Sequence, residues 1–199
     1  MEDPWEIVRM FERSVAEYAG SRYAVAVDAG TAALFLACKY LKVGQVSLPR
    51  KTYVSVPGAV VHAGGSVVFD ERQWVGEYTL DPYPIIDSAC RFRRGMHRPG
   101  TFRCLSFQYR KHLPIGRGGM ILCDDCDAVA WLKLARFFGR REIPLPEDNP
   151  RMIGWQLFME PERAARGLTF LSLLPDENED LRFDYPNLTQ LEAYRCQSS

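Results

Sequence analysis

The sequence lacks an excess of charge of either sign, because its 25 lysine and arginine residues are balanced by 25 aspartate and glutamate residues. Proteins that bind nucleic acids or anionic membranes carry a basic excess where they bind. The balance therefore argues against nucleic acid or a membrane as the main partner, although it leaves room for a local basic patch. The sequence also lacks an apolar run long enough to cross a bilayer, so no membrane span is expected.

The N-terminus lacks the basic and then apolar layout of a signal peptide, since it begins Met-Glu-Asp-Pro. The six cysteines are spread along the chain without the pattern of a small disulfide-bonded protein. Reduced thiols and a cytoplasmic location are therefore expected. The sequence is 47% hydrophobic and 12% aromatic, which is enough for one buried core and too much for a disordered chain.

The sequence contains little that points to a bound metal. Cys123 and Cys126 form a lone Cys-x-x-Cys pair, whereas a structural zinc ion usually needs two more ligands at a matching spacing. The three histidines, His62, His97 and His112, show no metal-ligand spacing. No metal is therefore expected.

Helical and strand-like segments alternate along the first seventy residues. Apolar side chains recur at helical spacing from Trp5 to Ala19, and a short β-rich run follows from Tyr23 to Val27. The alternation continues beyond them, which predicts an α/β fold with a mainly parallel sheet and flanking helices. Helices are predicted over 5–19, 32–41 and 53–63, and strands over 23–27, 45–49 and 66–70.

The rest of the chain is predicted to add three strands and three helices. One short strand ends in the carboxylate of Asp87, and Asp127 is expected to cap a helix. The stretch 142–150 contains three prolines and is expected to be a loop. Strands are predicted over 84–87, 101–107 and 119–123, and helices over 128–138, 160–174 and 188–195.

Four segments carry residues suited to ligand chemistry, and each also has an ordinary structural interpretation. Gly30 and Thr31 lead from a strand into a helix, where free backbone N–H groups can bind a phosphate or simply form a helix cap. Lys111 follows a strand, where it is either a solvated surface charge or a desolvated lysine that forms a Schiff base. Asp87 can pair with a buried donor or cap a loop, and Tyr53 can belong to the core or stack on a planar ligand.

Taken together, these residues match the needs of pyridoxal phosphate. That cofactor requires a lysine for its aldehyde, a carboxylate for its ring nitrogen, donors for its phosphate and a surface against its ring. The sequence supplies one candidate for each at the carboxyl end of a predicted strand, which is where ligands bind in open α/β sheets.

Segments from the first helix to the helix after Pro161 resemble, in order, the motifs of the DegT/StrS family of nucleotide-sugar aminotransferases. Each match is weak by itself, but their shared order makes the set specific. The resemblance implies the aspartate-aminotransferase-like fold, which is fold type I of the pyridoxal-phosphate enzymes. The segments are 17–20 (Glu-Tyr-Ala-Gly), 29–34 (Ala-Gly-Thr-Ala-Ala-Leu), 49–55 (Pro-Arg-Lys-Thr-Tyr-Val-Ser), 86–89 (Ile-Asp-Ser-Ala), 106–113 (Ser-Phe-Gln-Tyr-Arg-Lys-His-Leu), 116–119 (Gly-Arg-Gly-Gly) and 154–168.

The resemblance implies roles for three side chains around the cofactor ring. Lys111 would hold pyridoxal 5′-phosphate covalently and later move the proton between carbon atoms. Asp87 would pair with the ring nitrogen and keep it protonated, and Tyr53 would stack on the ring. Some relatives have histidine in place of the lysine and are dehydratases, but the spacing from Ser106 places Lys111, rather than His112, at that position.

The resemblance also implies a phosphate site and a homodimer. The backbone of Gly30 and Thr31, with the hydroxyl of Ser106, would hold the phosphate. Family enzymes share their active sites between two subunits, and Gln156 stands at the position that reaches across to the partner. The homodimer is therefore an expectation, with Gln156 near the partner's phosphate pocket.

The chain departs from the family pattern in length and at several positions. Ala29 replaces a serine, Arg117 replaces a glutamate, and Cys90 stands where relatives often have glutamine or histidine. Family members are considerably longer, and most of their small C-terminal domain has no counterpart here. We therefore expect a reduced catalytic domain that binds pyridoxal phosphate over 1–174 and a short C-terminal remnant over 175–199.

The resemblance implies an aminotransferase that takes an amino group from an amino acid such as glutamate and passes it to a keto sugar linked to a nucleotide. The alternative is a reduced homologue with little or no catalysis that serves as a cofactor-binding or assembly module. Nothing in the sequence selects one sugar. Arg93 and Arg94, in a basic cluster after Asp87, either contact a substrate diphosphate or belong to a solvated loop.

Overall fold

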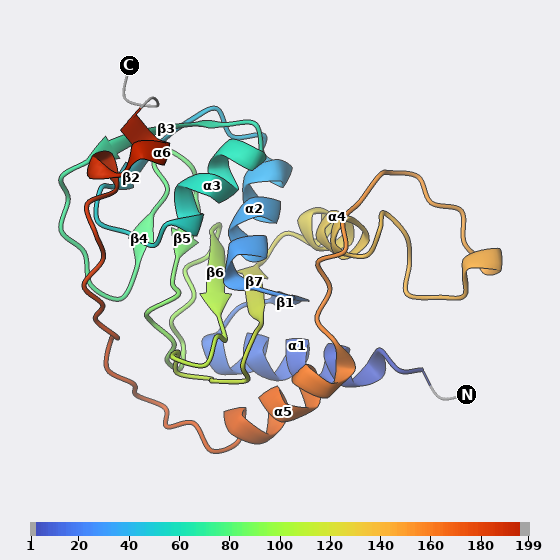
Figure 1. Ribbon diagram of the computed structural model, residues 1–199. Helices are drawn as coiled ribbons and strands as arrows, with labels where there is room; N and C mark the ends of the chain where they lie inside the picture. Colours follow the sequence, from blue (N-terminus) through green and yellow to red (C-terminus); the bar gives the residue numbers. More distant parts are fainter. Residues whose placement is uncertain (1–2, 196–199) are drawn as a thin grey trace.

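The computed structural model describes residues 3–195, so residues 196–199 of the predicted C-terminal remnant lie outside the described chain. Its order of elements is that of an α/β protein (Figure 1). The helices are α1 (Glu6–Ala19), α2 (Gly30–Leu41), α3 (Ser55–His62), α4 (Cys126–Arg136), α5 (Pro161–Leu171) and α6 (Glu192–Arg195), with short 3₁₀ helices η1 (Leu145–Glu147) and η2 (Leu188–Gln190). The strands are β1 (Tyr23–Val27), β2 (Gln45–Pro49), β3 (Ser66–Asp70), β4 (Tyr78–Thr79), β5 (Ile85–Asp87), β6 (Phe102–Ser106) and β7 (Gly119–Cys123).

The main sheet has five strands in the order β1-β7-β6-β5-β4, and β2 and β3 form a second, two-stranded sheet. Parallel pairing, which the sequence led us to expect, holds for β2 with β3 and for β5 with β6. The other three pairs are antiparallel, so the sheet is mixed. Parallel neighbours need a long crossover, whereas β6 returns directly into β7 through the loop 107–118 without a helix. An isolated antiparallel bridge joins Ser47 of β2 to Asp81, which lies just after β4.

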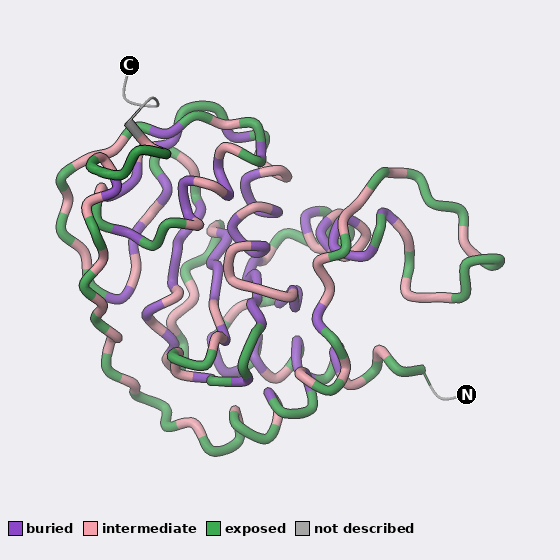
Figure 2. The backbone as a smooth tube through the Cα atoms, viewed as in Figure 1, coloured by how far each residue is buried: buried purple, intermediate pink, exposed green. Residues whose placement is uncertain are grey.

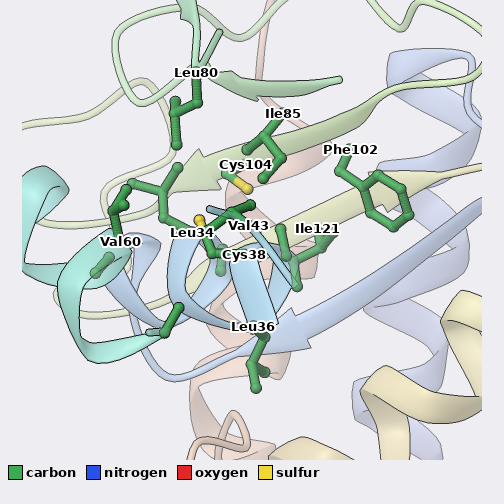
Figure 3. Close-up of a cluster of buried hydrophobic side chains, with 14 of the residues drawn as sticks. Leu34, Leu36, Cys38, Val43, Val60, Leu80, Ile85, Phe102, Cys104 and Ile121 are labelled. Atoms are coloured by element: carbon green, nitrogen blue, oxygen red, sulfur yellow. The ribbon is translucent and has the colours of Figure 1, made fainter. Parts of the chain in front are cut away.

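Side chains on the two faces of the main sheet belong to two separate apolar clusters. On β1, Val25 and Val27 belong to the first cluster, and the alternate residues Ala24 and Ala26 belong to the second. This is the alternation that a strand imposes on its side chains. Figure 3 shows part of the first cluster, where residues of α2 and α3 meet β5, β6 and β7. Both faces are therefore buried, as expected for a sheet covered by helices.

The second face is covered by α1 and α5, which pack side by side (Figure 1). Gly167 of α5 lies against the ring of Phe11, and a Cβ atom on this glycine would come within 2.5 Å of it. An ionic cluster is buried under α1. There the guanidinium of Arg136 donates to the Glu12 carboxylate and to the Ala26 carbonyl, while the Ala26 amide donates to Glu12 at 2.9 Å. Glu12 therefore ties α1, β1 and α4 together.

Several helix ends differ from the sequence-based expectation. Helix α4 begins at Cys126, because the side chain of Asp125, and not that of Asp127, accepts hydrogen bonds from the amides of Asp127 and Ala128. Asp125 has the extended backbone that a capping residue needs, whereas Asp127 already lies in the first turn. The expected last helix, 188–195, is divided into η2 and α6 at Leu191, whose backbone is extended.

Two segments run outside the layered body. The chain between α4 and α5 forms an excursion that projects away from the sheet, and after α5 the chain runs along the edge of the molecule to α6 (Figure 1). Figure 2 shows that both are mainly exposed or half-buried, in contrast to the purple strands of the sheet. Among the described residues, no helix is both long and apolar enough to cross a membrane.

Candidate active site

A cavity of about 340 Å³ lies where β5 and β6 end and α2 begins. Ligands of open α/β sheets bind at this edge, outside the carboxyl ends of parallel strands. The cavity brings together residues that are far apart in the sequence. Six of the residues predicted to bind the cofactor line it: Gly30, Thr31, Tyr53, Asp87, Ser106 and Lys111.

Asp87 ends β5 and is buried at the base of the cavity. Its Oδ1 atom accepts the Ala89 amide at 2.9 Å, and its Oδ2 atom accepts the Tyr78 hydroxyl at 3.0 Å. Burial raises the pKa of the Asp87 carboxyl, whereas these two hydrogen bonds and the charge of Lys111 lower it. A buried carboxylate whose hydrogen-bond donors are neutral is well suited to a cationic N–H partner.

Tyr78 is a site residue that the sequence did not reveal. Its own segment shows no clear period in the sequence, and it reaches Asp87 only because β4 pairs antiparallel with β5. Its hydroxyl also meets the Thr52 hydroxyl at 2.5 Å, so Thr52 and Tyr78 together support the carboxylate. Burial and the nearby Asp87 charge raise the pKa of the Tyr78 phenol well above its ordinary value, which keeps it a neutral donor.

Lys111 lies in the loop after β6, where its amide closes a turn on the Gln108 carbonyl at 2.9 Å. Its Nζ atom lies 3.6 Å from the Sγ atom of Cys90 and 4.4 Å from the centre of the Phe183 ring. Burial raises the pKa of the Cys90 thiol, so Cys90 is a neutral neighbour of the amine. The lysine therefore faces the cavity between a thiol and an aromatic ring.

The first turn of α2 forms the other end of the cavity. Backbone N–H groups of a first helical turn have no partner within their helix, and here they are joined by hydroxyl groups. The Thr31 and Ser55 hydroxyls are 2.7 Å apart, and the Ser106 side chain lies against Gly30. A Cβ atom on Gly30 would come within 2.8 Å of the Ser106 Cβ atom, so this close approach of helix and strand requires glycine.

Arg117 also lines the cavity, but its guanidinium is engaged by Asp28. Its Nη2 atom lies 2.5 Å from the Asp28 Oδ2 atom, and its Nε atom donates to the Asp28 carbonyl at 3.2 Å. Burial raises the pKa of the Asp28 carboxyl, while Arg117 acts to lower it. The arginine that replaces the family's glutamate thus has a counter-charge of its own.

Three predicted site residues lie outside this cavity. Gln156 is exposed and forms a backbone bridge with Phe137. Arg93 pairs with Asp180 at 2.6 Å, and Arg94 pairs with Asp176 at 2.6 Å. The structure therefore places the two arginines against acidic residues from the C-terminal part of the chain, and not against the site.

That C-terminal part also contributes two cavity-lining residues that the sequence did not reveal. Phe183 and Tyr185 line the cavity, as does Trp74 from the segment before β4. The Tyr185 ring stacks on the Trp74 ring, with centroids 5.8 Å apart. The expected remnant is thus part of the site wall. No sequence period marks these rings, because the segment has neither helical nor strand spacing.

Among residues 3–195, no three His, Cys, Asp or Glu side chains form a group that could hold a metal ion. Cys123 is buried in β7, whereas Cys126 is exposed at the start of α4.

Comparison with known proteins identifies related sequences. Residues 5–82 match the family model of the DegT/DnrJ/EryC1/StrS aminotransferase family. The spore coat polysaccharide biosynthesis protein SpsC of Bacillus subtilis is 36% identical over 81 residues, which are 39% of this chain and 20% of that protein. GDP-perosamine synthase of Caulobacter vibrioides is 26% identical over 81% of this chain and 55% of that protein. The chain thus spans 20% of the length of the first relative and 55% of the length of the second. These matches confirm the family resemblance seen in the motifs.

Solved structures confirm the fold class. The structure of 3-amino-5-hydroxybenzoic acid synthase superposes with a TM-score of 0.71 at 21% identity, over 84% of this chain and 56% of that one. DesI, solved in the presence of its TDP-sugar product, superposes with a TM-score of 0.66 at 23% identity, over 86% of this chain and 54% of that one. The chain therefore has the α/β fold of these enzymes over about half of their length.

Proposed function

Because this chain has the aminotransferase fold and matches the DegT/DnrJ/EryC1/StrS aminotransferase family over residues 5–82, we propose that it binds pyridoxal 5′-phosphate and transfers an amino group from an amino acid such as glutamate to a nucleotide-linked keto sugar. One observation carries this proposal. The cavity has the Lys111 amine and the buried Asp87 carboxylate near each other, and the start of α2 with its hydroxyl groups beside them.

The residues around the cavity fit this cofactor. The Asp87 carboxyl, buried among neutral donors, is suited to a protonated ring nitrogen. The glycine at the start of α2 leaves backbone N–H groups open to a phosphate, with the hydroxyls of Thr31 and Ser106 beside them. When bound, the cofactor supplies an aldehyde for amine exchange and a ring that withdraws electrons from the neighbouring carbon.

In the proposed reaction, each of three side chains has a separate task. Lys111 binds the cofactor through Nζ and carries a proton at that atom. Asp87 holds a positive charge at the base of the cavity, with Tyr78 fixing the orientation of its carboxylate. Tyr53, whose side chain is 57% exposed at the cavity wall, covers the cofactor ring from one side.

We also propose that the protein is a homodimer. The excursion between α4 and α5 projects from the body and carries exposed apolar residues, including Leu145 and Ile153, the latter 93% exposed (Figure 1). Gln156 follows on the same excursion and is exposed. A partner subunit that covers these residues would have its cavity next to Gln156. This placement supports the role that the resemblance implies for Gln156.

One observation favours the alternative, a cofactor-binding or assembly module with little catalysis. Arg117 at the cavity wall is tied to Asp28, and Phe183 covers the amine of Lys111, so the space available to a sugar substrate is restricted. The module would bind the cofactor without exchanging amino groups.

The proposal is tested by adding pyridoxal 5′-phosphate to the purified protein and following visible absorbance. Borohydride should then fix the cofactor to Lys111, as located by peptide mass spectrometry. Lys111→Ala should abolish both signals, and Lys51→Ala, which removes an exposed lysine outside the cavity, should leave both intact. Adding glutamate should convert the visible band. Cofactor binding without conversion by any amino donor would favour the module, and failure to bind the cofactor would refute both.

A further inference from the structure

The segment 175–188, here called the strap, runs from the end of α5 to η2 along the edge of the molecule (Figure 1). It is fixed to the body at two places. Near its start, the Arg94 amide donates to the Asp176 carbonyl and the Leu181 amide donates to the Cys90 carbonyl, both at 2.9 Å. At its end, the Leu188 amide donates to the Arg50 carbonyl at 2.9 Å.

The first attachment contains a charged socket for one carboxylate. Asp180 accepts Arg91 Nε at 2.8 Å and Arg93 Nη2 at 2.6 Å. It also packs against the backbone of Gly76, where a Cβ atom would come within 2.4 Å of the Asp180 carboxyl carbon. Gly76 has a positive φ of 76°, so it combines an unusual backbone with the space that the carboxylate fills. The body of the protein is thus shaped and charged to receive Asp180.

Between the two attachments, the strap crosses the cavity. Among the described residues, the hydrogen bonds and ring contacts of residues 182–186 all come from the side chains of Phe183 and Tyr185. The Phe183 ring lies over Lys111 Nζ at 4.4 Å, and the Tyr185 hydroxyl lies 3.6 Å from Cys90 Sγ. This span therefore has side-chain contacts to the site but no described backbone hydrogen bond that would hold it in place.

We propose that the strap is a gate over Lys111, which Asp180 in its socket holds shut. Breaking the ion pairs frees the span that carries both rings, and the lysine amine and the Cys90 thiol then become accessible to molecules in solution. The inference takes Lys111 as the reactive group of the proposed function, but the gate itself does not depend on any cofactor.

The test measures the chemical reactivity of the covered groups in the full chain without cofactor. The protein is treated briefly with acetic anhydride or with iodoacetamide, and peptide mass spectrometry gives the rates of Lys111 acetylation and Cys90 alkylation. Asp180→Asn should raise both rates roughly tenfold, because loss of a charge-assisted hydrogen bond favours local opening. The alkylation rate of exposed Cys126 should not change.

Asp184→Asn is the matched control, since it removes the same charge from the exposed part of the strap, where no ion pair is described. It should leave both rates at the wild-type value. Equal rates in the wild-type protein and in Asp180→Asn, or equal increases in both variants, would overturn the gate. The result stands apart from the proposed function, because neither reagent needs bound cofactor.

Unfolding of the Asp180 variant would be recognised by alkylation of Cys38 and Cys123, which are buried and do not line the cavity. In that event the Phe183→Ala variant tests the gate instead, because it keeps the Asp180 socket and removes only the ring over the Lys111 amine. It should raise the acetylation rate of Lys111 severalfold without exposing the buried cysteines. An unchanged rate in this variant would overturn the proposal.

Discussion

Tyr78 and Asp87 stand directly opposite each other on antiparallel strands β4 and β5, and the tyrosine hydroxyl donates to the aspartate carboxylate at 3.0 Å. The cross-strand register therefore sets the orientation of the carboxylate that the proposed function needs. The same hydrogen bond lowers the pKa of Asp87 against the effect of burial. A residue outside the recognised motifs thus controls one inside them.

The first prediction concerns this pair. Tyr78→Phe should weaken binding of pyridoxal 5′-phosphate about tenfold, which corresponds to about 1.4 kcal/mol, because the carboxylate loses a donor that stabilises its charged form. Spectroscopic titration with the cofactor measures the change. Tyr40→Phe is the control. The Tyr40 hydroxyl donates to the Asp125 carboxylate at 3.2 Å and lies outside the cavity, so its loss should not affect cofactor binding. Equal affinities for the wild-type protein and Tyr78→Phe would show that Asp87 does not need this support.

The second prediction tests the close contact at the start of α2. Gly30→Ala should lower the free energy of unfolding by about 1–3 kcal/mol, because its Cβ atom would overlap the Ser106 side chain. Gly58→Ala, in α3, meets no atom within 4 Å and should instead stabilise the protein by about 0.4–1 kcal/mol. Urea denaturation of the two variants measures both effects. The steric argument fails if the two substitutions change stability in the same direction.

The third prediction concerns the buried ion pair under α1. Glu12→Gln should cost up to about 3 kcal/mol of unfolding free energy, because the buried Arg136 guanidinium loses one of its two carboxylate partners and keeps only Glu142. Glu6→Gln, whose ion pairs with Arg9 and Arg13 are exposed, should cause no measurable change. Thermal and denaturant unfolding provide the measurement. A small effect of Glu12→Gln would mean that Glu142 alone satisfies Arg136.

The fourth prediction gives a pH dependence for the strap. The hydrogen bonds from Arg91 and Arg93 lower the pKa of Asp180 below its ordinary value of 3.8. A carboxyl with a lowered pKa contributes stability that is complete above its unfolded pKa and is lost as the pH falls through its folded pKa. The stability difference between wild type and Asp180→Asn should therefore be constant from pH 7 to about pH 5 and shrink below about pH 4. A difference that already disappears near pH 6 would assign the stabilisation to another group.

The alternating elements of the first seventy residues could be predicted because each has its own apolar period. The gathering of Lys111, Asp87 and Gly30 could be expected as well, since all three follow or adjoin strand ends. The antiparallel partners could not be foreseen, because strand direction depends on how the chain returns and not on the strand's own residues. The choice of Asp125 over Asp127 as the helix cap rests on one backbone angle, which composition does not reveal.

The strap could not be predicted for a different reason. Its place is determined by Asp180 meeting Arg91 and by Phe183 meeting Lys111, and these partners are distant in the sequence. A polar segment without a period looks like a loop or a tail until its partners are known. For the same reason, the sequence leaves open whether Arg93 and Arg94 contact a substrate or lie in a solvated loop, because their acidic partners in the strap are distant along the chain.

The pairing of β1 with β7 also determines the order in which the protein can fold during synthesis. Tyr23 lies opposite Cys123, so the first strand leaves the ribosome long before the strand that completes its pairing. Until then the edge of β1 is unpaired, and α1 has only part of the surface it finally covers. The strap emerges later still, so the loop that carries Lys111 is synthesised before the segment that covers it.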